Sequence, residues 1–174
     1  VEVTLGEMIH HLKAVRRGVS RAPVAVDLPS HTYDTPDQAL ESARMLVEAG
    51  ADAVKLEGPL PEIVNHLASS EIEVIGHLGM LPQHVREEGG YHRKGKTDSE
   101  AMALMEAALS LQAAGCCALV LERLQQNAGN ASIWQGLRIH VGRQLTPRLS
   151  CSAQRLALRC SSHALQVPAK HGLH

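Results

Sequence analysis

The chain has 174 residues, a formal net charge of −1 and a hydrophobic content of 44%, which is long enough to bury one hydrophobic core. It contains no apolar run long enough to cross a bilayer, and its first residues lack the basic-then-apolar pattern of a signal peptide. These features exclude a membrane-spanning class, and we expect a soluble, cytoplasmic protein with no membrane partner.

The charge is distributed unevenly along the chain. Residues 1–122 contain all 18 acidic residues and 10 of the 17 Lys and Arg, a net −8, whereas residues 123–174 carry +7 and no acid. We therefore divide the chain into a domain at 1–122 and a basic tail at 123–174, which we interpret as foreign or out-of-frame sequence. The alternative is an appendage that binds RNA or anionic surfaces, but with one Trp and no Tyr or Phe to stack on bases we expect no nucleic-acid partner.

The first predicted element is a helix from about residue 5 to residue 17. Thr4 and Glu7 have the spacing of a capping box before an apolar-periodic segment, and Gly18 closes the helix. A short buried strand follows at 24–26 and ends in Asp27. The four Cys fit neither a zinc spacing nor a secreted framework, so we expect reduced thiols.

A second helix and a second strand follow. Thr35 is the predicted N-cap, Pro36 lies in the first turn, and Gly50 is the predicted C-cap. The strand DAVKLEG then places Lys55 and Glu57 on the same face, because side chains alternate along a strand. These charges either face a ligand at the end of a parallel strand or form an exposed ion pair on an edge strand.

The remaining pattern adds two helices and two strands. A helix at 61–70 leads to the strand 73–79, which contains His77, and a long Gly-containing connection at 80–99 has the length of a functional loop. A helix over Ser99–Ala114 leads to the strand 116–122, which ends in Glu122. The alternation of strands and helices predicts an α/β fold with a parallel sheet.

Ionisable residues thus stand at the ends of four consecutive strands, and parallel strand ends converge at one edge. Asp and Glu oxygens suit Mg²⁺, and a more distant carboxylate could accept a proton. Taken singly, Asp27 could instead cap a turn or helix, and His77 could be a structural histidine. The set together predicts a metal site with an acid/base group.

These motifs also resemble a known family. The segments VTLGEMIHHLKAVRRG, VAVDLP, TPDQALESARMLVEAGADAVKLEG, VIGHLGMLPQ, GGYHRKGKTDSEA and AAGCCALVLE are together similar to the ketopantoate hydroxymethyltransferase family over about residues 2–122. The resemblance implies a (β/α)8 TIM barrel of the phosphoenolpyruvate/pyruvate type, here incomplete, with about four central βα units.

The resemblance also implies a function. The family transfers a hydroxymethyl group from 5,10-methylenetetrahydrofolate to 3-methyl-2-oxobutanoate in pantothenate biosynthesis, with Mg²⁺, as a homodecamer. Carried onto this sequence, Asp27 is a metal ligand that also contacts substrate, and Glu57 is the carboxylate at the metal. Lys55 and His77 hold the oxo acid, and Glu122 is the general base.

The chain departs from the family pattern at three places. We find no counterpart of a Gly-Asp-Ser motif that supplies a second metal-binding Asp, Ser30 stands where the family usually has Phe, and the sequence after Glu122 does not align. We therefore expect the chain by itself to be incomplete, and two alternatives stay open. One is another Mg²⁺-dependent oxo-acid lyase or aldolase of the same barrel superfamily, and the other is an inactive fragment.

Overall fold

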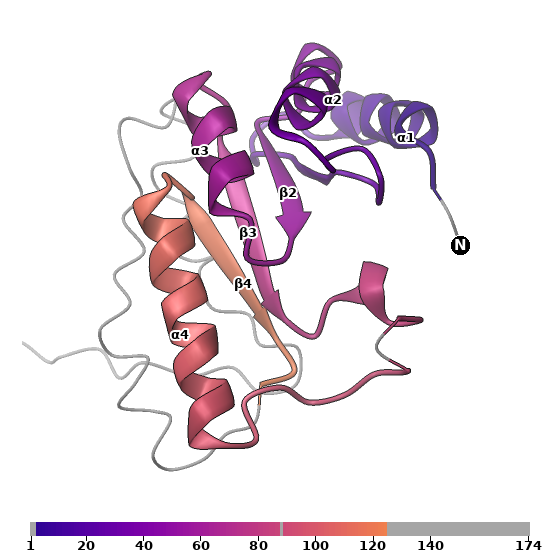
Figure 1. Ribbon diagram of the computed structural model, residues 1–174. Coiled ribbons are helices and arrows are strands. Elements are labelled where there is room, and N and C mark those ends of the chain that lie inside the picture. The colour runs from indigo at the N-terminus through magenta and orange to yellow at the C-terminus, as the bar shows by residue number, and fades with distance from the viewer. Residues whose placement is uncertain (1–2, 88, 125–174) are drawn as a thin grey trace, which may run out of the picture.

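The computed structural model describes residues 3–87 and 89–124 (Figure 1). In chain order the elements are α1 (Leu5–Gly18), β1 (Ala25–Asp27), α2 (Pro36–Glu48), β2 (Ala53–Glu57), α3 (Pro61–Ser69), β3 (Val74–Gly79), the 3₁₀ helix η1 (Pro82–His84), α4 (Asp98–Ala113) and β4 (Ala118–Glu122). The alternation of helix and strand is as the sequence predicts. From residue 125 onward the predicted tail lies outside the described residues.

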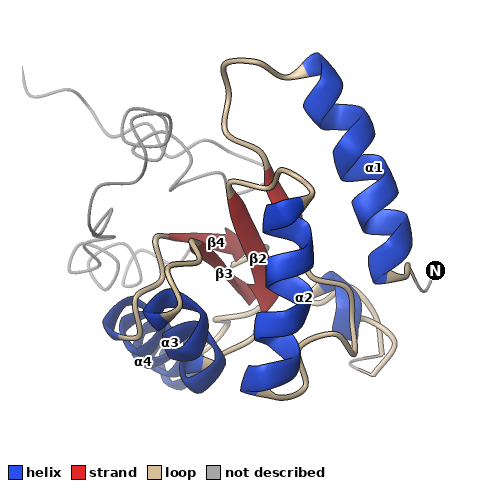
Figure 2. Cartoon of the chain, turned by 90° about the horizontal axis from the view of Figure 1, so that it is seen from above, coloured by secondary structure: helices blue, strands red, loops and turns tan. Residues whose placement is uncertain are grey.

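The four strands form one parallel sheet in the order β1-β2-β3-β4. Lys55 in β2 pairs with Asp27 on one side and with Ile75 on the other, so β2 is an interior strand. The alternative of an ion pair on an edge strand is therefore wrong. Figure 2 shows α2, α3 and α4 gathered on one side of the strands.

The helix ends follow the predicted capping rules with small shifts. The Thr4 side chain accepts the Glu7 N–H while the Glu7 carboxylate accepts the Thr4 N–H, which confirms the capping box. Thr35 caps α2 as predicted, but the C-cap of α2 is Ala49, one residue before the predicted Gly50. Gly50 instead adopts a φ of 110° directly after the cap, a conformation that glycine adopts without strain.

The two faces of the sheet have different compositions. The helix-covered face carries the main core, which includes Val54, Leu56, Val74 and Leu119. The opposite face carries a small apolar cluster of Ala53, Ile75, Cys117 and Ala118. The site described below lies on this second face, toward the carboxyl ends of the strands.

Cys116 and Cys117 are both buried free thiols, in agreement with the sequence prediction for these two residues, whereas Cys151 and Cys160 lie outside the described residues. Cys116 belongs to the helix-side core and Cys117 to the cluster on the opposite face. The Cys116 Sγ accepts the Gly76 N–H at 3.0 Å, and burial raises the pKa of this thiol to about 11. Cys116 is therefore a structural residue of the core at neutral pH.

A bidentate contact connects α1 to the residue before β2, at the end of the sheet where the strands begin. The Arg16 guanidinium donates to both carboxylate oxygens of Asp52, at 3.0 and 3.3 Å, and the Val24 N–H donates to the same carboxylate at 2.8 Å. Both side chains are largely shielded, with relative exposures of 26% and 17%. This contact joins three segments at the amino ends of β1 and β2.

We expect Asp52→Ala to lower the free energy of unfolding by about 1–3 kcal/mol, because it leaves a partly buried guanidinium and a main-chain N–H without their acceptor. Urea denaturation measures the change. Asp34→Ala is the matched control, since Asp34 is 62% exposed and its ion pair within residues 3–87 and 89–124 is with the exposed His31; it should change stability by less than about 0.5 kcal/mol. Equal effects of the two substitutions would contradict the prediction.

Candidate active site at the carboxyl ends of the strands

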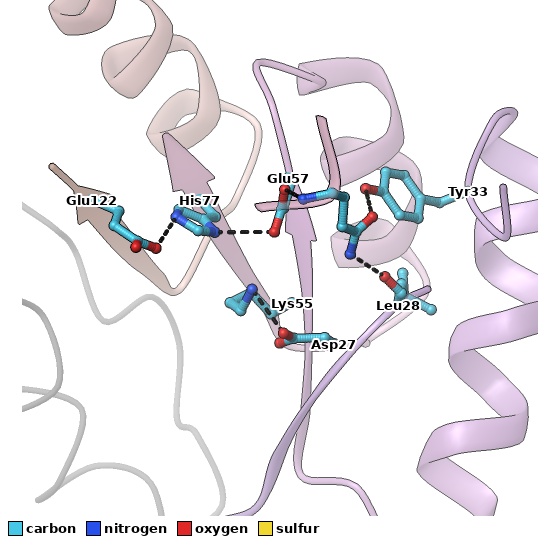
Figure 3. A network of polar contacts seen from close by, with 8 residues as sticks. Asp27, Leu28, Tyr33, Lys55, Glu57, His77 and Glu122 are labelled. Carbon is cyan, nitrogen blue, oxygen red and sulfur yellow. Dashed lines mark hydrogen bonds and ion pairs between the residues drawn. The ribbon is translucent and has the colours of Figure 1, made fainter. Parts of the chain in front are cut away.

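The structure brings all five predicted site residues to one face of the sheet. Asp27, Lys55, Glu57, His77 and Glu122 extend from four neighbouring strands toward one another (Figure 3). Side chains two positions apart on a strand share a face. Lys55 is two positions after Ala53, and His77 is two positions after Ile75, so both lie on the face that carries the small apolar cluster. The predicted convergence of the strand ends is therefore observed.

His77 lies between two carboxylates. Its Nδ1 is 3.5 Å from Glu57 Oε1 and its Nε2 is 3.3 Å from Glu122 Oε2. The residue is only 2% exposed, yet within the described part of the chain neither ring nitrogen has a hydrogen-bond partner. Each ring nitrogen therefore has a carboxylate oxygen as its neighbour, but at a geometry looser than a hydrogen bond.

Asp27 and Lys55 form the second pair of the site. Lys55 Nζ lies 3.0 Å from Asp27 Oδ2, and the exposed fraction of the side chain is 18% for Lys55 and 49% for Asp27. Asp27 does not cap α2, whose N-cap is Thr35. The predicted opposite charges on β2 thus share a face, but Lys55 pairs with β1 while Glu57 contacts β3.

Both oxygens of the Glu57 carboxylate are engaged. Oε2 accepts the main-chain N–H of Gln83 at 3.0 Å, while Oε1 faces His77. Burial by itself would raise the pKa of Glu57, but the contact with His77, the hydrogen bond from Gln83 and the positive charge of Lys55 outweigh it and hold the pKa below its ordinary value. Glu57 is therefore a buried, ionised carboxylate with a fixed orientation.

The connection between β3 and α4 borders the site at both of its ends. It begins with η1, which contains Gln83. Farther along, the Lys94 N–H donates to the Arg123 main-chain oxygen at 3.2 Å, directly after β4. The Arg123 guanidinium lies 5.9 Å from the centre of the Tyr91 ring. The prediction that this loop is functional is consistent with its position and stays a prediction.

The sequence analysis missed Gln83 and Tyr33. The Tyr33 hydroxyl donates to Gln83 Oε1 at 2.7 Å, and Gln83 Nε2 donates to the Leu28 main-chain oxygen at 3.0 Å (Figure 3). Neither residue stands at a strand end, so the rule that found the other site residues does not apply to them. The Pro82 that begins η1 was the available signal of a tight turn close to the site.

The described residues do not form a closed metal centre. Across residues 3–87 and 89–124, no three His, Cys, Asp or Glu side chains are arranged to hold a metal ion together. Mg²⁺ usually takes one or two carboxylates and keeps several waters. The half-exposed Asp27 is the more open of the two predicted metal carboxylates, since Glu57 is buried and engaged by Gln83 and His77, and a Mg²⁺ site here stays a prediction.

Comparison with solved structures identifies the class of fold. The chain superimposes on 2,3-dimethylmalate lyase, a PEP mutase/isocitrate lyase superfamily member, with a TM-score of 0.55 at 12% identity, covering 77% of this chain and 48% of that one. Phosphonopyruvate hydrolase gives a TM-score of 0.55 at 11% identity, covering 89% of this chain and 57% of that one. The described residues therefore have the fold of part of a (β/α)8 barrel, which confirms the predicted fold class.

The sequence comparisons place the chain within one family. The pattern of the ketopantoate hydroxymethyltransferase family matches residues 1–142, so the chain belongs to that family. The 3-methyl-2-oxobutanoate hydroxymethyltransferase of Gloeobacter violaceus is 50% identical over 127 residues, covering 70% of this chain and 49% of the relative. That of Wolinella succinogenes is 46% identical over 123 residues, covering 69% and 47%. The chain thus spans about half the length of these curated relatives.

No helix in the described part of the chain is both long and apolar enough to cross a bilayer.

The family match extends to residue 142, which is 20 residues beyond Glu122. The division of the chain at residue 122 stays a prediction.

Proposed function

We propose that this chain contributes the substrate-activating half of a 3-methyl-2-oxobutanoate hydroxymethyltransferase. The reaction transfers a hydroxymethyl group from 5,10-methylenetetrahydrofolate to 3-methyl-2-oxobutanoate, gives 2-dehydropantoate, and belongs to pantothenate biosynthesis. The observation that carries the proposal is the convergence of Asp27, Lys55, Glu57, His77 and Glu122 at one end of the sheet in a member of this family.

In this proposal the residues on β2 and β3 bind the oxo acid. Lys55 and the buried His77 supply positive charge and ring N–H groups for the carboxylate and carbonyl oxygens of the substrate. A Mg²⁺ ion held by Asp27, with Glu57 beside it, would polarise the substrate carbonyl. Because the contacts of His77 with Glu57 and Glu122 are longer than good hydrogen bonds, a ring N–H can turn to a substrate oxygen in this proposal.

Glu122 is the proposed general base. Its side chain is 24% exposed and stands at the end of β4, 3.3 Å from His77 Nε2, so it is accessible to a substrate held by His77. It takes the proton from C3 of the oxo acid, and the electron pair left on C3 attacks the methylene carbon of the folate. The methylene carbon is bonded to two folate nitrogens. The attack of C3 breaks the first of these carbon–nitrogen bonds, and water displaces the second nitrogen and supplies the oxygen of the new hydroxyl group. The proton from C3 and one proton from water end on the two freed nitrogens.

The wider expectations belong to the same proposal. They are Mg²⁺ as cofactor, folate as co-substrate, a homo-oligomer of the family's decameric type, and a cytoplasmic location. Because the chain spans about half the length of its curated relatives, the rest of the barrel would come from outside the described residues. The fold likeness to a lyase does not favour the lyase alternative, since at 12% identity it reports architecture alone.

Exchange of the C3 proton tests the proposal. The full chain is incubated in D₂O with 3-methyl-2-oxobutanoate and Mg²⁺, and proton NMR follows the C3 signal. The proposal predicts exchange above the buffer rate and, when the folate is added, formation of 2-dehydropantoate. A folded chain that gives exchange only at the buffer rate would refute the proposed function for this chain.

A further inference from the structure

Gln83 joins three segments at the carboxyl end of the sheet. Its main-chain N–H donates to Glu57 at the end of β2, and its side chain contacts Leu28 and Tyr33, which follow β1. Leu28 is itself fixed, because its N–H donates to the Lys55 main-chain oxygen at 2.8 Å. Gln83, which follows β3, is therefore anchored to both of the preceding strands.

The orientation of the Gln83 side chain is determined by its partners. A main-chain carbonyl can only accept, so the Leu28 oxygen requires the amide nitrogen of Gln83 and turns the amide oxygen toward Tyr33. The Tyr33 hydroxyl must then donate. Burial, together with the charges of Glu57, Asp27 and Asp34, raises the pKa of Tyr33 to about 12 despite a hydrogen bond that the phenol oxygen accepts from the Glu57 main chain, so the hydroxyl keeps its proton at neutral pH.

The turn that carries Gln83 has little stability of its own. η1 comprises three residues and has no side-chain hydrogen bond at its N-cap. Short 3₁₀ turns contribute little by themselves, because few hydrogen bonds offset the entropy of fixing their backbone. The two side-chain bonds of Gln83 therefore hold the turn against the sheet and aim its main-chain N–H at Glu57.

We propose that Gln83 is a positioning residue that fixes the orientation of the Glu57 carboxylate, with Tyr33 as the donor that holds Gln83 in place. With Oε2 held by the Gln83 N–H, Oε1 is directed toward His77 and the centre of the site. The hydrogen bonds of Gln83 are present in the structure whatever reaction the chain catalyses. The expected effect on substrate binding, in contrast, rests on the proposed function.

The first test measures hydrogen exchange of the Gln83 main-chain amide by NMR in the full chain. Tyr33→Phe removes one hydroxyl without altering residue 83, and we expect it to speed exchange of this amide by about tenfold. Gln38→Met is the matched control, because Gln38 bonds to His31 and Asp34 in the same loop but does not contact Glu57. An unchanged rate in Tyr33→Phe, or an equal increase in Gln38→Met, would overturn the inference.

The second test separates positioning from general damage to the site. Gln83→Met preserves length while removing both side-chain bonds. We expect it to weaken binding of 3-methyl-2-oxobutanoate, in the presence of Mg²⁺, by about 10–100-fold. At saturating oxo acid, the C3 exchange rate should stay within about threefold, because Glu122, the proposed base, has no contact with Gln83 among the described residues. Calorimetry measures the affinity and NMR measures the exchange, at a temperature where circular dichroism shows the variant folded.

The outcomes distinguish the two proposals. Loss of exchange at saturation together with weaker binding would mean that Gln83 supports the whole site, which overturns the inference. If the unchanged chain binds no oxo acid, the proposed function fails, and the amide-exchange test alone decides the role of Gln83. Faster amide exchange in Tyr33→Phe with no change in Gln38→Met supports that role in either case.

Discussion

Glu122→Gln is expected to slow C3 proton exchange of 3-methyl-2-oxobutanoate by about 10²–10⁴-fold, which is the usual contribution of a positioned general base. An amide cannot accept the proton, although it keeps the size of the side chain and its position 3.3 Å from His77. Binding of the oxo acid should change little, because its proposed contacts lie on β1, β2 and β3. Proton NMR in D₂O and calorimetry measure the two quantities.

Glu73→Gln is the control for this substitution. Glu73 directly precedes β3, at the amino ends of the strands, and contacts Cys117. It therefore lies far from the proposed site along β3, and Glu73→Gln should leave C3 exchange unchanged. If Glu122→Gln exchanges the C3 proton as fast as the unchanged chain, Glu122 is not the base. A similar loss in Glu73→Gln would show that the effect arises from the fold.

Gly79→Ala is expected to lower the free energy of unfolding by about 2–4 kcal/mol, from backbone strain and overpacking combined. Gly79 has a φ of 98°, and a Cβ at this position would overlap the main-chain oxygen of Glu122. That oxygen also accepts the Met80 N–H at 2.9 Å. The ends of β3 and β4 would have to separate, which moves Glu122 away from His77.

Gly89→Ala separates the two causes. Gly89 also has a positive φ, of 73°, but a Cβ there meets nothing within 4 Å. It should therefore incur only the backbone strain, about 1–2 kcal/mol. Urea denaturation measures both variants, and C3 exchange should fall in Gly79→Ala alone. Equal losses of stability would show that the contact between Gly79 and Glu122 contributes nothing.

The residues at the strand ends could be predicted from the sequence because two simple periodicities determine them. Parallel strands bring their carboxyl ends to one edge, and the two-residue alternation assigns a face, so Lys55, Glu57 and His77 follow from position alone. The interior position of β2 was not predictable in the same way. It depends on which strands pair, and β1 contributes only three residues to the sheet.

The pairings within the site could not be predicted from position in the sequence. Lys55 and Glu57 share a face, but side-chain length and strand register decide that Lys55 reaches Asp27 and that Glu57 contacts His77. Gln83 and Tyr33 enter the site from loops, where no periodicity applies. Their contacts join residues that are far apart in the sequence, and a local sequence pattern does not show which distant residues meet in the fold.

The same limit applies to the charge of the buried groups. Sequence position indicates that Glu57 ends a strand, but its lowered pKa follows from the competition between burial and its contacts with His77, Gln83 and Lys55. A buried carboxylate without these partners would have a raised pKa. Only the folded arrangement shows that the partners outweigh the burial.

Isothermal titration of the full chain with 3-methyl-2-oxobutanoate, with and without Mg²⁺, tests the central claim most directly. The converging residues at the strand ends predict binding that requires Mg²⁺ and that Glu57→Ala abolishes, because this variant removes the carboxylate proposed to lie beside the metal. A folded chain that shows no binding, or binding that is independent of both Mg²⁺ and Glu57, would contradict the claim that these residues form an oxo-acid site.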